Sequence, residues 1–541
     1  MYPTLDEHKV CFITPPSAFN AYTGTAINAA TQVYPYLPYQ YLSAWLKKLD
    51  MGFKTSALDM GIEYNPWEIL GNYLMHERPK YLGLSFTTPL YYEAKLIGMV
   101  AKDLLGPELV LVHGGVHAST LWNESLTDSM CDVVVTGEGE VTFEEICQGK
   151  PFSEISGIVY REDRGRRQLL SAEEIVNRIQ KGESCYSIQS GVIVSDVESS
   201  IIIKKTFNRP FIKDAKKSLD DLPFPDMELY DVYKYKNPTI IAKGYPMQQV
   251  ETSRGCPFTC NFCSAEDAYR VMSPGYVVEL YKFLIRYGIK EFRIIDDQFL
   301  TNVKRGKAIV QAMLDAGIKI PWNMANGVRA DRVDEEFLEM AARTGCYQIG
   351  AGYESGDQAA LDSIQKSLDL NKSVTCMEMI KKYNIETVGF FMIATPADTE
   401  ASMQKTINFA KKLKPDFAKV TVCIPFPDTR LYADYDRRGL ILSKKWDDYN
   451  IHRAIGVYKH PNGLTPAIID KYYWKFYREF YFNPRWMWWK GLKSLRDGTL
   501  FRNMNLGRKV FLAKLMPDDP RKWVTKRSPN LLEAGTPQVL K

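Results

Sequence analysis

Short apolar runs alternate with longer amphipathic segments through the first 150 residues. The apolar runs predict strands at 10–14, 54–59, 81–86, 109–113 and 132–136. Helical periodicity follows at 39–49 and 94–105, and a further helix is expected to begin at 137. Alternation of this kind is typical of a doubly wound parallel sheet, which binds ligands at the carboxyl ends of its strands. The pattern therefore predicts an α/β, Rossmann-like domain over residues 1–150.

Glycines, hydroxyl groups and single charged or imidazole side chains gather in the loops after three of these strands. They are Ser85, Thr87, Gly114, Gly115, His117, Gly137 and Glu138. A Gly-Gly pair lets the backbone approach a bulky ligand without interference from Cβ atoms. These loops are the candidate ligand edge of the first domain.

Residues 151–240 form a less regular linker region. Apolar runs at 155–160 and 199–204 predict edge strands, with a charged stretch at 161–167 between them. A proline-stiffened connector follows at 219–226.

From 241 to 442 the strand–helix alternation resumes. Strands are predicted at 248–252, 291–295, 322–325, 347–352, 387–393 and 418–423, and helices at 275–287, 304–316 and 334–344. About six such units predict a partial (β/α)6 barrel, a fold that carries its chemistry at the carboxyl ends of the strands.

The bulk composition limits the class of protein. A chain of 541 residues exceeds one ordinary core, and 45% hydrophobic with 25% charged residues is typical of soluble globular proteins. No secretory signal opens the chain, and no run approaches about 18 apolar residues, the length of a membrane span. The net charge of +5 does not by itself indicate nucleic acid. Seven scattered cysteines without paired spacing favour reduced thiols and a cytoplasmic location.

The other three cysteines, Cys256, Cys260 and Cys263, have the spacing CxxxCxxC. A [4Fe-4S] cubane normally takes four cysteines, so three thiolates leave one iron open to an outside ligand. Phe262 would add a flat surface beside that open corner. The alternative is a zinc loop, but zinc sites usually have a fourth ligand and CxxC pairs. No further cysteine or histidine follows Cys263 until Cys346.

This cysteine pattern resembles that of the radical S-adenosylmethionine (SAM) superfamily. The resemblance implies a [4Fe-4S] cluster whose open iron chelates SAM, and an external electron donor such as flavodoxin or ferredoxin. One electron would then split SAM to a 5′-deoxyadenosyl radical, which abstracts hydrogen from an unactivated carbon.

Later loops resemble the same superfamily. Asp297 matches the acidic turn after the second barrel strand, and Glu354 lies in a Gly-x-Glu-Ser-Gly segment that holds SAM in this family. Arg329 is expected either at the SAM carboxylate or in a surface salt bridge. Two glycines of the family pattern are replaced, by Ala394 and by Asp428.

The first domain resembles the cobalamin-binding domain that precedes many radical SAM cores, over about residues 9–150. The resemblance implies that the loop residues given above for the first domain contact cobalamin. The Asp-x-His-x-x-Gly motif that supplies an axial histidine is absent, since the chain reads Asp59-Met-Gly-Ile at that point. His117 is given no axial role, and a Rossmann-like domain without a ligand remains the alternative.

Together these features predict a class B radical SAM methyltransferase, which would transfer a methyl group from cobalamin to a hydrophobic or natural-product substrate. The main alternative is radical cyclisation, carbon–carbon coupling or oxygen insertion, with or without cobalamin. A tRNA methylthiolating enzyme is disfavoured, because the first domain has no second cysteine triad. A further alternative is an iron–sulfur protein that binds nucleic acid and catalyses no reaction. Only the basic C-terminus supports it.

Residues 443–541 predict a helical, aromatic and basic C-terminal region that ends in a tail after Met516. Aromatic rings are dense at 472–482 and 485–490, and the cations that follow are Lys493, Arg496, Arg502, Arg508, Lys509 and Lys514. Three roles stay open: a helical cap on the barrel, contact with a membrane surface, or stacking on single-stranded nucleic acid.

Overall fold

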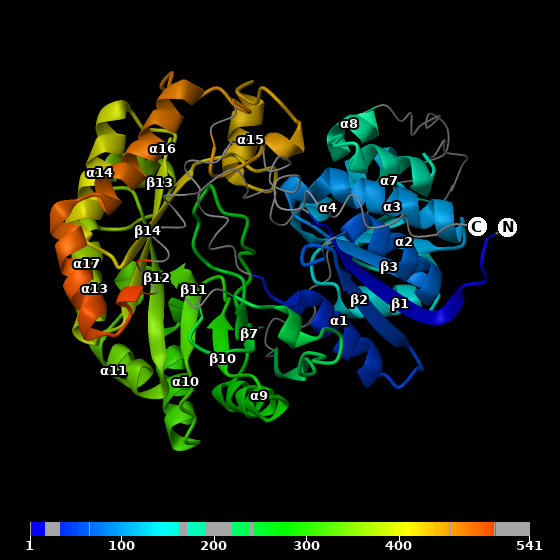
Figure 1. The fold of residues 1–541 in the computed structure, drawn as a ribbon, viewed down its shortest axis with the longest axis horizontal. Coiled ribbons are helices and arrows are strands. Elements are labelled where there is room, and N and C mark those ends of the chain that lie inside the picture. Colours follow the sequence, from blue (N-terminus) through cyan, green and yellow to red (C-terminus); the bar gives the residue numbers. More distant parts are fainter. Residues whose placement is uncertain are drawn as a thin grey trace.

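The computed structural model describes residues 2–16, 33–63, 65–161, 170–190, 219–237, 242–453 and 456–501, together with Met504. Two parallel sheets organise these residues, and Figure 1 shows them side by side, one in blue and cyan, the other in green to orange. We call the part around the first sheet the N-terminal lobe and the part around the second the barrel lobe. The predicted strand at 199–204 and most of the charged stretch at 161–167 lie outside the described residues.

The first sheet has the strand order β2-β1-β3-β4-β5-β6. Its strands are β1 (Asp6–Thr14), β2 (Lys54–Asp59), β3 (Pro79–Ser85), β4 (Val110–Gly114), β5 (Val133–Val135) and β6 (Ile158–Tyr160). All neighbours pair in parallel except β6, which is antiparallel to β5 at the edge. The predicted edge strand at 155–160 is therefore present, although it is shorter. In this strand order the ligand crevice opens between β1 and β3, where the direction of winding reverses.

Helices cover both faces of this sheet. They are α1 (Leu37–Lys48), α2 (Pro66–Glu77), α3 (Tyr91–Leu105), α4 (Gly115–Thr120), α5 (Trp122–Asp128), α6 (Glu140–Cys147), α7 (Ala172–Gln180) and α8 (Cys185–Ser190). The doubly wound α/β fold predicted for this lobe is confirmed.

The second sheet is an open, fully parallel barrel with the order β14-β13-β12-β11-β10-β7. Its strands are β7 (Met247–Val250), β10 (Glu291–Ile294), β11 (Trp322–Val328), β12 (Cys346–Glu354), β13 (Glu386–Ile393) and β14 (Phe417–Val422). The outer helices are α9 (Pro274–Tyr287), α10 (Val303–Asp315), α11 (Glu335–Thr344), α12 (Gln358–Ser363), α13 (Leu370–Lys382), α14 (Glu400–Leu413) and α15 (Arg430–Arg437). The predicted partial barrel is confirmed.

Local sequence sets the ends of these helices. Helix α9 begins after Ser273, whose hydroxyl accepts a hydrogen bond from the Tyr276 N–H, and it ends at Gly288, where φ is 108°. Serine at the N-cap and a left-handed glycine at the C-terminal end satisfy backbone groups that the helix itself leaves unpaired.

The C-terminal helices α16 (Pro466–Tyr481) and α17 (Pro484–Arg496) lie on the side of the barrel lobe away from the N-terminal sheet (Figure 1). The hydroxyls of Tyr477 and Tyr481 exchange hydrogen bonds with the backbone of Val420 and Ala418. They thereby cover the free edge of β14, which would otherwise present unpaired backbone groups. Most aromatics of α16 thus serve as a cap on the barrel.

Helix α17 differs, because its aromatic residues have divided roles. Trp486 packs on Phe480 and Tyr481, and its Nε1–H donates to the Pro415 carbonyl at 2.9 Å. Trp488 is 72% exposed. Among the described residues, no helix combines the length and apolar character needed to span a membrane.

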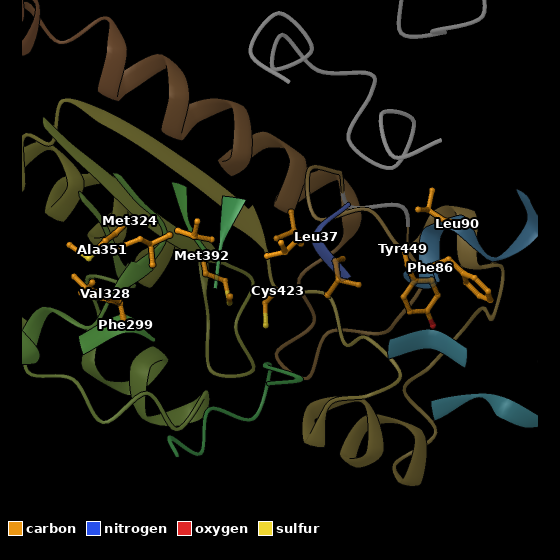
Figure 2. Close-up of a cluster of buried hydrophobic side chains, with 14 of the residues drawn as sticks. Leu37, Phe86, Leu90, Phe299, Met324, Val328, Ala351, Met392, Cys423 and Tyr449 are labelled. Atoms are coloured by element: carbon orange, nitrogen blue, oxygen red, sulfur yellow. The ribbon is translucent and has the colours of Figure 1, made fainter. Parts of the chain in front are cut away.

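One hydrophobic core continues from the barrel into the N-terminal lobe. Figure 2 follows it from Met324 and Val328 in the barrel to Phe86 and Leu90 in the N-terminal lobe. The carboxyl ends of the two sheets consequently meet across a packed junction, where the candidate site residues gather.

Candidate cluster and cofactor site

The three motif cysteines lie on a loop closed by a small two-stranded sheet. Strand β8 (Ser253–Arg254) pairs antiparallel with β9 (Arg270–Val271) at the base of this loop. Gly255 has φ +79°, and a Cβ at this position would lie 2.2 Å from the Ala268 carbonyl oxygen. Only glycine fits there, so the residue before Cys256 is required by the shape of the loop.

The sulfur atoms are suited to an iron–sulfur cluster. Cys256 and Cys260 are half-buried and Cys263 is exposed. The Ala265 N–H lies 3.5 Å from the Cys263 Sγ, and the Phe258 N–H donates to Cys256. Hydrogen bonds of this kind tune cluster-bound thiolates. Within the described residues, no three His, Cys, Asp or Glu side chains converge on one point where a single metal ion could bind. A cubane does not need such convergence, because each cysteine binds a different iron.

Two adjacent aspartates tie the cluster loop to the barrel. Asp296 is buried and accepts hydrogen bonds from the Thr252 N–H, the Thr252 hydroxyl and the Ser253 hydroxyl, at 2.6–2.7 Å. Asp297 accepts one from the Gly255 N–H at 3.1 Å. Asp297 thus contacts the loop backbone directly beside Cys256.

Glu354 lies at the carboxyl end of β12 in an unusual backbone conformation, with φ 56°. Its Oε1 accepts a hydrogen bond from Lys366 at 2.9 Å, and both side chains are nearly buried. A Cβ on Gly352 would lie 2.7 Å from this Oε1, so the first glycine of the Gly-x-Glu-Ser-Gly segment makes room for the ion pair. A left-handed non-glycine residue is strained, and such strain is common at functional sites.

Arg329 is buried rather than at the surface. Its guanidinium pairs with Asp331 at 3.0 and 3.2 Å and donates to the carbonyls of Lys366 and Ser367. It also lies 4.1 Å from the ring centroid of Phe258, in the cluster loop. Arg329 therefore braces the cluster loop against the loop after Glu354. Phe262 is half-buried and packs on the core.

The two glycines after β4 have different surroundings. A Cβ on Gly114 would have no atom within 4 Å, whereas one on Gly115, at φ +87°, would lie 2.8 Å from the Ser85 Oγ. Gly115 is thus required by packing against the loop after β3, and Gly114 borders open space. Ser85 hydrogen-bonds the Tyr36 hydroxyl at 2.9 Å, and Thr87 is exposed.

His117 is 1% exposed, and neither of its ring nitrogens has a hydrogen-bond partner among the described residues. Its ring centroid lies 4.6 Å from that of Tyr91. Burial lowers the pKa of His117 to about 3, so the ring is neutral at pH 7. A buried imidazole without partners is costly, which marks this position as one where a further group fits.

A cavity joins the two lobes at this point. His117, Thr87 and Thr120 line it from the N-terminal lobe, and Ser264, Phe426 and Asp428 line it from the barrel lobe. Ser264 directly follows Cys263. The Thr120 hydroxyl donates to Asp428 at 2.8 Å, so the aspartate that replaces a family glycine links the lobes.

Gly137 has φ +82°, and the Glu138 that follows it reaches the base of the cluster loop. The carboxylate of Glu138 pairs with Arg254 at 2.9 Å and with Arg270. Arg254 also pairs with Glu140 and Glu251. Sequence reasoning placed Glu138 at a ligand edge but missed its arginine partners, which are 116 and 132 residues away. The only signal was the position of Arg254, two residues before Cys256.

Residues 250–410 match the model of the Radical SAM superfamily. This part of the chain is a radical SAM domain, and it contains the three cysteines, Asp297, Arg329 and Glu354. The predicted enzyme class is confirmed, and with it the [4Fe-4S] cluster and SAM that this class requires.

Two curated relatives cover most of the chain. It is 29% identical to an uncharacterized methyltransferase of Pyrococcus horikoshii, over 75% of this chain and 80% of that protein. It is 25% identical to the anaerobic magnesium-protoporphyrin IX monomethyl ester cyclase of Cereibacter sphaeroides, over 78% of this chain and 63% of the cyclase. The chain thus spans less than two thirds of the cyclase.

Among solved structures, the fold is similar to that of the cobalamin-dependent SAM radical enzyme OxsB with aqua-cobalamin bound. The TM-score is 0.60 at 16% identity, over 96% of this chain and 74% of that one. At this identity the likeness establishes the shared fold of both lobes.

Proposed function

We propose that the protein is a cobalamin-dependent radical SAM methyltransferase. The observation that carries this proposal is the cavity between the lobes. It brings the ligand edge of the Rossmann-like sheet, represented by Thr87 and His117, against Ser264, the residue after Cys263. Cofactor chemistry of this kind depends on the protein to hold the reacting groups close together and away from water.

Each set of residues has a distinct role in this proposal. Cys256, Cys260 and Cys263 would hold the cluster, and Glu354, Arg329, Asp297 and Phe262 would lie around SAM. When bound, the cluster and SAM supply a deoxyadenosyl radical, and cobalamin supplies a methyl group. Asp297 and Arg329 support the cluster loop, and the ion pair with Lys366 fixes the carboxylate of Glu354.

The residues of the N-terminal lobe fit cobalamin in two respects. Open space beside Gly114 permits a bulky group to approach the backbone. The ring of His117 lies at the cavity, and its nitrogens have no hydrogen-bond partner among the described residues. Ser85, Thr87, Gly115 and Gly137 shape the surrounding loops. Glu138 contributes by holding the cluster loop rather than through a free carboxylate.

A cyclase is the second candidate, and the relative from Cereibacter sphaeroides supports it. Both candidates share the radical step and differ in whether a methyl group is transferred. S-adenosylhomocysteine would accumulate with a methyltransferase and would not with a cyclase. In either case the partners are a small-molecule substrate and an external electron donor, and peripheral membrane contact stays a prediction.

The test uses the full chain, reconstituted anaerobically with iron, sulfide and hydroxocobalamin. We expect about one corrin per chain, formation of 5′-deoxyadenosine, and S-adenosylhomocysteine once substrate is present. Cys260→Ala should abolish the cluster absorbance and 5′-deoxyadenosine, because it removes a thiolate ligand. SAM cleavage by a triple cysteine variant would contradict the assignment.

Two glycine variants test the cobalamin lobe separately. Gly114→Val places its side chain in open space, so it should lower corrin occupancy several-fold while the thermal midpoint stays close to that of the wild type. Gly115→Val should lower the thermal midpoint itself, because its side chain would collide with the loop after β3. Full corrin occupancy in Gly114→Val would exclude this loop from the corrin site.

A further inference from the structure

Two cationic side chains on opposite sides of the open barrel face its concave interior. On β10, Phe292 and Ile294 are buried beneath the outer helices, and Phe292 stacks on Tyr281 of α9. Successive side chains of a strand point to opposite faces, so Arg293 projects inward. On β14, Ala418 and Val420 are buried in the same way, which directs Lys419 inward.

The neighbours of Lys419 support this placement. Lys419 is in register with Phe390 of β13. The ring of Phe390 lies across Gly327 and Gly350 on the inner face of β11 and β12, where a Cβ would come within 3.0 and 2.7 Å of it. The two glycines therefore make room for the Phe390 ring on the inner face of the sheet, and Arg293 and Lys419 lie on strands to either side of it.

Neither cation has an acidic partner in the part of the chain that the structure describes. No carboxylate there forms an ion pair with Arg293 or Lys419, and the guanidinium of Arg293 lies 5.3 Å from the ring centroid of Tyr34. Glu291 shares the inner face, but it accepts hydrogen bonds from the backbone of Lys243 and Gly244 and from the Tyr347 hydroxyl.

The pKa of Lys419 reflects two like charges on the inner face of one sheet. Lys419 is accessible to solvent, yet burial by surrounding protein and then the charge of Arg293 lower its pKa to about 8. His452 also faces Lys419, and burial followed by that charge lowers its pKa to about 4, so it is neutral. Uncompensated cations in such a place are costly unless an anion joins them.

We propose that Arg293 and Lys419 bind a dianionic phosphoryl group, a phosphate or a phosphonate, on the substrate. Two cations match the charge of a dianion, and the planar guanidinium matches its oxygens. Arg293 lies three residues before Asp296, which holds the base of the cluster loop, so the anion lies roughly 10 Å below that loop. The inference rests on the proposed function, because the barrel interior is where a radical SAM substrate would lie. The inference narrows the hydrophobic or natural-product substrate predicted from the sequence to one that carries a phosphoryl group.

The probe is inorganic phosphate, titrated calorimetrically into the anaerobically reconstituted full chain. Arg293→Gln and Lys419→Met should each weaken phosphate binding about tenfold or more, since each removes a charge-assisted contact. Lys412→Met, which removes an exposed cation of α14, should bind phosphate as the wild type does. Acetate should bind more weakly than phosphate; equal binding of the two would overturn the phosphoryl assignment.

The pH dependence supplies a second readout. The dianionic form of phosphate requires protonated Lys419, so wild-type affinity should fall as the pH rises above about 8, where inorganic phosphate is already mostly the dianion. Tyr34, Glu291, Tyr347, Arg293 and His452 also face this region, but only Lys419 is expected to change charge near that pH. Lys419→Arg should retain binding and lose this fall, because arginine stays protonated. Its packing is close to that of lysine, so it tests the inference even if Lys419→Met is poorly folded.

Separate measurement of 5′-deoxyadenosine formation distinguishes the two proposals. If the wild type cleaves SAM but binds phosphate no more tightly than the double variant Arg293→Gln/Lys419→Met, the anion site is overturned and the proposed function stands. Phosphate binding without SAM cleavage would leave the anion site in place and overturn the proposed function.

Discussion

At the scale of single residues, two non-glycine residues at the carboxyl ends of barrel strands have a left-handed backbone. Glu354, the last residue of β12, has φ 56°, and Ala394, directly after β13, has φ 59°. For an L-residue this conformation costs roughly 1–2 kcal/mol relative to the right-handed one, because Cβ approaches the carbonyl oxygen. Glycine avoids the cost, which explains why the family pattern has glycine at the position that Ala394 occupies.

We therefore expect Ala394→Gly to stabilise the protein by about 1 kcal/mol, after allowance for the greater freedom of glycine in the unfolded chain. The measurement is the thermal midpoint of unfolding. Ala316→Gly is the matched control, because Ala316 follows α10 with φ −82° and gains nothing from glycine. A midpoint for Ala394→Gly at or below that of the control would show that the left-handed conformation carries no such cost here.

Residue-scale chemistry was predictable from the sequence only where the residues are close together in the chain. The cysteine loop and the Gly-x-Glu-Ser-Gly segment could be located because each spans a few residues. The pair Arg293 and Lys419 could not, because the two residues share the inner face of the sheet only after β10 and β14 have assembled with three strands between them. Lys366 was likewise missed as the partner of Glu354, since nothing in its spacing indicates a buried ion pair.

At the scale of elements, most predicted strands were within one to three residues of those observed, because their apolar runs are short and bounded by polar turns. Helix α7 was not predicted, although Ser171 caps it and Ile175 is buried, since the surrounding region has little regular pattern. The sequence also could not predict that α16 covers the edge of β14, because this contact depends on the hydroxyl groups of α16 rather than on the apolar character of that helix.

Helix α17 allows its aromatic residues to be tested one at a time. Trp486→Ala should lower the free energy of unfolding by about 2 kcal/mol, because a half-buried ring and its hydrogen bond to Pro415 are lost. Trp488→Ala should leave stability unchanged, since its ring is exposed. If α17 contacts lipid, Trp488→Ala should instead reduce sedimentation with anionic vesicles.

The cations of α17 refine that vesicle experiment. Lys490 and Lys493 both pair with buried Asp416, and Arg496 contacts Asp497. Arg502, Arg508, Lys509 and Lys514 lie outside the described residues. The part of vesicle binding that depends on Trp488 should thus persist in added salt. Equal sedimentation of wild type and Trp488→Ala would favour α17 as a cap alone.

At the scale of the whole molecule, an ion-pair network joins the lobes beside the cluster. Arg254 and Arg270 lie opposite each other in the β8–β9 pair, where two like charges would repel. Glu138, from the loop after β5, lies between them and pairs with both. Burial alone would raise the pKa of Glu138, but the two arginines outweigh it and hold that pKa below its usual range.

We expect Glu138→Gln to cost about 3 kcal/mol, because it leaves the buried Arg270 paired only with the exposed Glu266 and removes one of the three carboxylates around Arg254. Amide hydrogen exchange across 255–269 should accelerate in this variant, since the base of the cluster loop loses its link to the N-terminal lobe. Glu154→Gln, an exposed change in the same lobe, should exchange like the wild type. Because the folded pKa of Glu138 is lowered, its contribution is complete at neutral pH and is lost only as the pH falls below about 4.3 toward that lowered value. Wild-type exchange in the loop should therefore approach that of Glu138→Gln in acid. Unchanged exchange in the variant at pH 7 would show that the cluster loop keeps its shape without the N-terminal lobe.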